Sequence, residues 1–103
     1  MNSPIPPFAK QFNHVGANLN VIIGMYELGQ EEKASSYVEQ AELTLKSLID
    51  DPALPQEVKQ KLGSSLEGLE NFVKSPSGQA WYSATYNFQQ AYHQLIPPPQ
   101  MRG

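Results

Sequence analysis

The sequence predicts an all-α protein with an up-down-up-down antiparallel four-helix bundle. Apolar residues recur at alternating steps of three and four in separate segments, no segment shows the apolar–polar alternation of a strand, and the connections are short. The chain has 103 residues, enough for one domain with a core. Because proline cannot continue a helix, Pro-rich tails are expected at residues 1–7 and 97–103, framing a bundle at residues 8–96.

The first helix is expected from Phe8 to Leu28, with Gly29 at the position after its end that favours glycine. The second is expected from Glu31 to Ile49 and is ended by the Asp50-Asp51-Pro52 segment. Their predicted core positions are Phe8, Phe12, Val15, Leu19, Ile22 and Tyr26, then Ala34, Val38, Ala41, Leu45 and Leu48.

Pro55 is expected in the first turn of the third helix, while Ser75 as N-cap and Pro76 as first residue open a fourth helix that runs to about Ile96. The predicted core positions are Val58, Leu62, Ser65, Leu69 and Phe72, then Trp81, Thr85, Phe88, Tyr92 and Leu95. In this topology the first and fourth helices are neighbours.

Charge is segregated along the chain. Of its 17 charged residues, 15 lie between Glu27 and Lys74, and residues 11–26 and 75–101 have none. A helix without charges has no ordinary solvated face. The first and fourth helices are therefore expected to be buried on more than one side, to cover each other, or to form a contact surface.

Each uncharged helix carries a second stripe, about 110° around the helix from its core positions. The first-helix stripe consists of His14, Val21 and Met25, with Asn18 at its edge, and the fourth-helix stripe consists of Tyr82, Tyr86, Gln89 and His93. Interface cores are rich in Tyr and Met and poor in Lys and Glu. One interpretation makes both stripes partner-binding surfaces, and the other makes them additional core of a skewed bundle.

Composition excludes several functions. Seven scattered Lys and Arg residues and a net charge of −3 make no nucleic-acid surface. The absence of cysteine excludes disulfides, thiol catalysis and Cys-based zinc sites. No apolar run reaches the ~20 residues of a membrane span, and no signal peptide is recognisable, so a cytoplasmic location without membrane contact is expected.

The only two histidines, His14 and His93, would lie at the same height in an antiparallel pair, as two axial haem ligands do. Neither is at a core position, and Gln11 and Gln90 stand where a di-iron Glu-x-x-His site needs carboxylates. No nucleophile, base and orienting group can be assembled. We therefore expect no metal, no cofactor and no catalysis.

Residues 12–51 resemble the helical hairpin of histidine-kinase dimerisation and phosphotransfer domains. The segment LNVIIGMYEL at residues 19–28 is similar to the family's Leu-Asn-x-Ile-Ile-Gly-x-x-Glu-Leu, and LKSLIDD at residues 45–51 to its Leu-Ile-Asn-Asp ending. The family's acceptor histidine aligns with Asn13, which cannot form a phosphoramidate, and His14 is rotated about 100° from that position. The resemblance implies a decoy, adaptor or antagonist that keeps the packing without phosphotransfer.

The sequence thus predicts a non-catalytic helical protein that binds another protein through the uncharged faces of its first and fourth helices, as a regulatory adaptor or antagonist. A homodimer is a further expected assembly. The alternative is a small-ligand or cofactor-binding bundle whose cavity is lined by the same aromatic residues.

Overall fold

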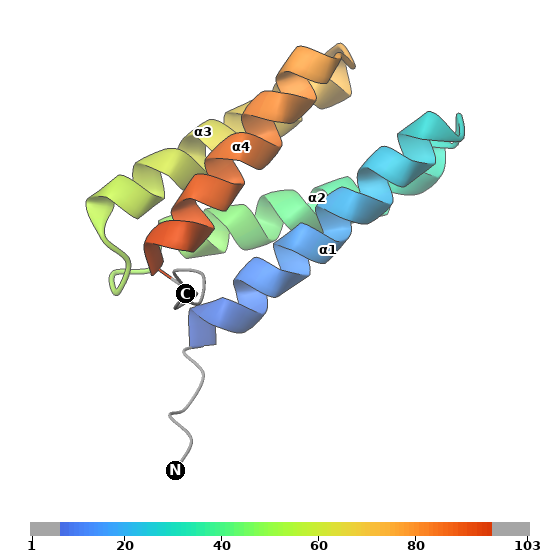
Figure 1. Ribbon diagram of the computed structural model, residues 1–103. Coiled ribbons are helices and arrows are strands. Elements are labelled where there is room, and N and C mark those ends of the chain that lie inside the picture. Colours follow the sequence, from blue (N-terminus) through green and yellow to red (C-terminus); the bar gives the residue numbers. More distant parts are fainter. Residues whose placement is uncertain (1–6, 96–103) are drawn as a thin grey trace, which may run out of the picture. The chain divides into compact units, whose positions relative to one another are not determined.

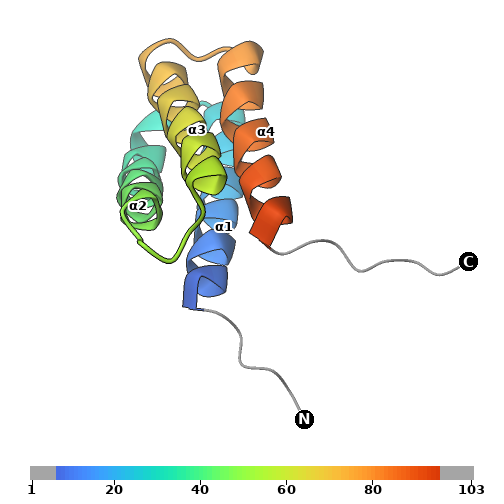
Figure 2. The same cartoon turned by 90° about the vertical axis from the view of Figure 1, so that its left-hand side faces the viewer.

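The computed structural model describes residues 7–95, so the predicted tails, apart from Pro7, lie outside the described part. Four helices follow one another: α1 (Pro7–Glu27), α2 (Glu31–Ile49), α3 (Gln56–Lys74) and α4 (Gly78–Leu95) (Figure 1). The predicted all-α class and the four helices are confirmed, and residues 7–95 contain no strand. The chain divides into two compact units, Met1–Asp51 and Pro52–Gly103. Each unit is a helical hairpin whose two helices run antiparallel (Figures 1 and 2).

A glycine turn closes the α1–α2 hairpin. Gly29 has φ +73°, which only glycine adopts without strain. Its N–H donates to the Tyr26 carbonyl at 3.1 Å, and the Gln30 N–H donates to the Met25 carbonyl at 2.8 Å. These two bonds satisfy carbonyls at the end of α1 and form a Schellman motif, as the sequence predicts for Gly29.

The core positions of the first hairpin agree with the spacing argument. Phe12, Val15, Leu19 and Ile22 are buried on α1, and all five predicted positions of α2 are buried. Phe8 and Tyr26, at the two ends of α1, are half-buried. Fully burying a Leu, Ile, Val or Phe side chain contributes about 1.5–3 kcal/mol, so these seams are a large part of what holds the helices.

The beginnings of α3 and α4 differ from the prediction. Pro55 has φ −62° and ψ 151°, an extended conformation, and is the N-cap of α3 rather than part of its first turn. Ser75 is the C-cap of α3, because its N–H donates to the Asn71 carbonyl at 2.9 Å. The N-cap of α4 is therefore Ser77, whose Oγ accepts the Ala80 N–H at 3.1 Å, and the expected start at Ser75 and Pro76 is wrong by two residues.

The buried face of α4 also differs from the predicted one. The buried residues are Ala84, Phe88 and Ala91, whereas Trp81, Thr85, Tyr92 and Leu95 are half-buried. Small residues turn inward because α3 and α4 lie very close: a Cβ built on Gly68 would be 2.7 Å from the backbone nitrogen of Ala84. The bulky Trp81 packs instead at the edge, 4.9 Å from the ring of Phe72.

Candidate interaction surfaces

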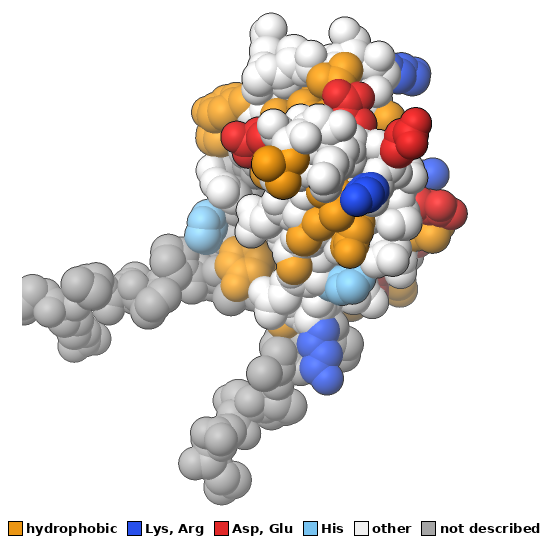
Figure 3. All heavy atoms as spheres, turned by 90° about the vertical axis from the view of Figure 1, so that its right-hand side faces the viewer, with side chains coloured by type: hydrophobic (Ala, Val, Ile, Leu, Met, Phe, Trp, Pro, Cys, Tyr) orange, Lys and Arg blue, Asp and Glu red, His pale blue; other side chains and the backbone are white. Residues whose placement is uncertain are grey.

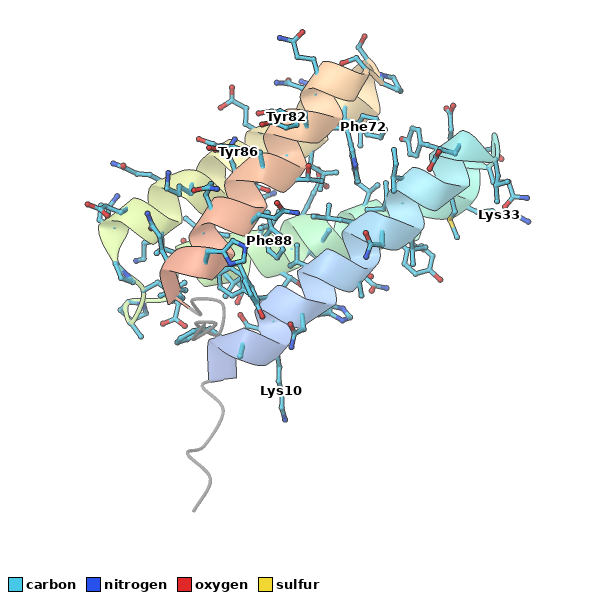
Figure 4. The ribbon with its side chains drawn as sticks, viewed as in Figure 1. Lys10, Lys33, Phe72, Tyr82, Tyr86 and Phe88 are labelled. Atoms are coloured by element: carbon cyan, nitrogen blue, oxygen red, sulfur yellow. The ribbon has the colours of Figure 1, made fainter. Side chains whose placement is uncertain are left out.

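The fourth-helix stripe lies on the surface. Tyr82, Tyr86, Gln89 and His93 are all exposed, the two tyrosines at 64% and 45% of their area. Their rings are stacked, with centroids 5.4 Å apart and planes at 19°. Figure 4 shows both tyrosines leaving α4 on one side and Phe88 on another. The sequence-predicted residues of this stripe are thus brought together on one face.

The stacked rings of Tyr82 and Tyr86 form a flat apolar surface with the two hydroxyl groups at its edge. Tyr82 and Tyr86 are one helical turn apart, so each ring supports the other without help from a second helix. Their polar neighbours are tied to α4 itself: Thr85 Oγ1 donates to the Trp81 carbonyl at 3.1 Å, and Asn87 Nδ2 donates to the Ser83 carbonyl at 2.7 Å. If a partner covers this surface, the two rings lose little side-chain entropy, because they are already stacked on each other.

The first-helix stripe is divided between surface and core. His14 is exposed, Val21 is exposed at 37%, and Met25 is half-buried. Asn18 is only 5% exposed, and its Nδ2 has no hydrogen-bond partner among residues 7–95. Asn18 therefore lies among the buried residues of α1, and the accessible part of the stripe is His14 and Val21 with the edge of Met25.

α1 carries a second row of regularly spaced positions that was not predicted from the sequence. Six positions follow the same steps of four and three as the core seam, displaced by two residues and hence to the opposite side of the helix. They are Lys10, His14, Ala17, Val21, Gly24 and Leu28, which we call the outer seam. Five of them are exposed, Leu28 at 75%, and Gly24 is half-buried. The spacing alone could have revealed this seam.

A hollow adjoins the N-terminal half of the outer seam. It lies between α1 and α2 and has a volume of about 420 Å³. Its lining residues are Lys10, Gln11, His14, Leu43, Thr44 and Ser47. Leu43 is 60% exposed and belongs to this lining. The lining carries a cation and no carboxylate, unlike the acid-rich remainder of the first hairpin.

Another hollow, of about 330 Å³, lies on the second hairpin and is lined by polar residues of α3 and α4. Neither of these hollows is lined by Tyr82 or Tyr86. In the face of the molecule drawn in Figure 3, exposed hydrophobic side chains form separate patches, and charged side chains lie beside several of them. Tyr82 and Tyr86 are thus exposed on α4 without forming the wall of either hollow.

Burial, and secondly the nearby Glu31 carboxylate, raise the pKa of the Tyr26 hydroxyl above its ordinary value. Within residues 7–95, no three His, Asp or Glu side chains gather as metal ligands. None of the four helices in the described part is long and apolar enough to cross a membrane.

Comparisons of the chain with protein-family models, with curated proteins and with solved structures gave no match. The resemblance of residues 12–51 to the histidine-kinase hairpin stays a prediction. Asn13, at the aligned acceptor position, and the following His14 are both exposed on α1.

Proposed function

We propose that this chain is a non-catalytic helical protein that binds another protein through the exposed stripe of α4, with the outer side of α1 as a further contact surface. The observation that carries the proposal is the stacked pair Tyr82 and Tyr86. Large rigid aromatic side chains supply most of the binding energy in protein interfaces. Exposed aromatic side chains that lie together on a surface are typical of interaction sites.

The shape and composition of the α4 stripe favour a protein over a small ligand. Small-molecule sites are concave and enclose most of the ligand. Tyr82 and Tyr86 stand on the outer side of one helix and are 64% and 45% exposed. Gln89 and His93 extend the stripe by two further turns, which gives the elongated, uncharged surface that a helix or strand of a partner covers.

The biological role we propose is that of a regulatory adaptor or antagonist in the cytoplasm. Net charge and composition leave no basic surface for nucleic acid. The resemblance of the first hairpin to histidine-kinase domains, with Asn13 in place of the acceptor, supports a role in which docking continues without phosphotransfer.

The test is affinity purification with the immobilised chain and with three variants, Tyr82→Ala, Tyr86→Ala and Val73→Ala. Val73 is a matched control because it is an exposed hydrophobic side chain of α3 that belongs to neither proposed contact surface. We expect the same protein to be retained by the wild type and by Val73→Ala. Its affinity should fall at least about 30-fold with Tyr86→Ala, the loss typical of an interface hot spot.

Circular dichroism and thermal melting of the same variants show whether the rings stabilise the fold instead. We expect helicity and melting temperature to be nearly unchanged, because both rings are exposed. A large loss of melting temperature in Tyr86→Ala, or equal retention of the partner by all variants, contradicts the proposal. A strong visible absorbance band from the purified chain would instead favour the small-ligand alternative.

A further inference from the structure

The outer seam of α1 is not accounted for by the packing of its own hairpin. Lys10, His14, Ala17 and Val21 are exposed on the side of α1 opposite its core seam. Among the residues that the structure describes, a Cβ on Gly24 would meet no atom within 4 Å, so no contact within residues 7–95 requires a glycine there. The alternating steps of four and three are the spacing by which one helix packs along another.

We propose that the outer seam pairs with the same seam of a second copy of this chain, with the two α1 helices antiparallel. The seam has a cation at one end, Lys10, and exposed carboxylates around its other end, Glu27 and Glu31. An antiparallel pair brings each Lys10 to the level of Leu28 of the other copy, next to Glu27 and to the turn that leads into Glu31. A parallel pair would set Lys10 against Lys10, which is unfavourable.

Side-chain sizes complement one another in this antiparallel register. When the two seams overlap fully, His14 faces Gly24 of the other copy, and Ala17 faces Val21. Each larger residue thus meets a smaller one, and the two-fold axis repeats every contact. Gly24, which no internal contact explains, becomes the space that the second copy's His14 occupies.

The hollow beside Lys10 gives Leu28 a place to bind. Leu28 is 75% exposed, and its N–H donates to the Gly24 carbonyl at 3.1 Å, so the α1 geometry continues through it. In the antiparallel register it lies at the level of Lys10, next to the hollow whose apolar lining residue is Leu43. Moving a leucine side chain from water into contact with apolar groups is favourable by about 2 kcal/mol. In a two-fold dimer this burial occurs twice.

This inference rests on the proposed function only in taking the outer side of α1 as a contact surface, and it does not involve the rings of α4.

From Lys10 to Leu28 the seam is about 27 Å long at 1.5 Å per residue. One helix pair and two inserted leucines make a contact smaller than a standard interface, so a dimer with a dissociation constant in about the micromolar range is expected.

Sedimentation equilibrium of the whole chain, from about 5 to 500 µM, measures this dimer. We expect Leu28→Ser to raise the dissociation constant at least about tenfold, because the substitution acts twice in a two-fold dimer. Val73→Ser is the matched control, since Val73 is an exposed hydrophobic residue of α3, and it should leave the constant unchanged. A chain that is monomeric at the highest concentration overturns the inference, as does a dimer that Leu28→Ser does not weaken.

Charge reversal tests the pairing of the ends. Lys10→Glu should weaken the dimer about tenfold, and Lys10→Glu combined with Glu27→Lys and Glu31→Lys should restore it, because opposite charges again meet. All three side chains are exposed, so the fold tolerates the changes, as circular dichroism can verify. Failure of the combined variant to recover affinity, while it remains helical, contradicts the antiparallel register.

Because the chain has no cysteine, oxidative cross-linking can report the orientation directly. His14→Cys mixed with Gly24→Cys should form a disulfide-linked dimer, whereas His14→Cys alone should not, since its two copies would be about 15 Å apart along the axis. Efficient linking of His14→Cys alone indicates a parallel pair and overturns the inference. Partner retention that still depends on Tyr86 in a monomeric chain would leave the proposed function intact while removing the dimer.

Discussion

The hydroxyl of Ser65 on α3 donates a hydrogen bond of 2.6 Å to the backbone carbonyl of Ala84 on α4. Both residues are buried, and one turn further along α3 the backbone of α4 passes so close to Gly68 that a Cβ there would be 2.7 Å from the Ala84 nitrogen. These contacts fix the rotation of α4 against α3. They hold Ala84 inward and thereby keep Tyr82 and Tyr86 on the outside.

Ser65→Ala should lower the free energy of unfolding by about 1 kcal/mol, the usual net contribution of one hydrogen bond. The Ala84 carbonyl keeps its place in α4, so no buried acceptor is left wholly without a partner. Urea unfolding followed by circular dichroism measures the loss. Ser64→Ala is the control, because Ser64 is exposed on the same helix and its removal should change stability by less than about 0.5 kcal/mol.

Gly68→Ala should be destabilising although alanine favours helix. The methyl group would collide with backbone, which cannot rotate away, and overpacking costs about 1–3 kcal/mol against a propensity gain of about 1 kcal/mol. We expect a net loss of about 1 kcal/mol and a melting temperature lower by about 4–8 °C. The same change at Gly63, where a Cβ would meet nothing within 4 Å, should instead stabilise the chain. Equal effects at both positions would disprove the close approach of the two helices.

The raised pKa of Tyr26 predicts a pH dependence of stability. The folded state binds the hydroxyl proton more tightly than the unfolded state, so this contribution is fully present below the ordinary tyrosine pKa of about 10 and is lost as pH rises through the folded value. Between about pH 9 and 11 the wild type should therefore lose more melting temperature than Tyr26→Phe. Parallel curves for the two proteins would contradict the shift.

Sequence patterns predicted the seams of α1, α2 and α3 because large aliphatic side chains at steps of three and four leave little choice of face. The face of α4 could not be read in this way. Ala84 and Ala91 are small enough to be neutral in a hydrophobicity argument, and the reason they turn inward is Gly68 on another helix. Likewise, two serines, Ser75 and Ser77, were equally good caps by type, and the end of α3 decided between them.

The candidate surfaces were partly predictable for the same reason. The absence of charge and the helical spacing identified Tyr82 and Tyr86, but not the stacking of their rings, which depends on side-chain rotamers. The outer seam could have been predicted from spacing, since its positions from Lys10 to Leu28 repeat the steps of four and three of the core positions. The burial of Asn18 could not be predicted, because a polar residue next to a core position can equally well lie on the surface.

Asn18 gives the last prediction. Its side chain is 5% exposed, and its Nδ2 has no hydrogen-bond partner in the described part of the chain, a situation that costs about 1–3 kcal/mol. Asn18→Leu removes the unpaired amide and fills a similar volume, so the free energy of unfolding should rise by about 1 kcal/mol or more. Asn20→Leu, on the exposed side of α1, is the control and should gain at most about 0.5 kcal/mol from helix propensity. If Asn18→Leu is clearly less stable than the wild type in urea unfolding, the amide has a partner in solution, and the core around α1 is hydrated there.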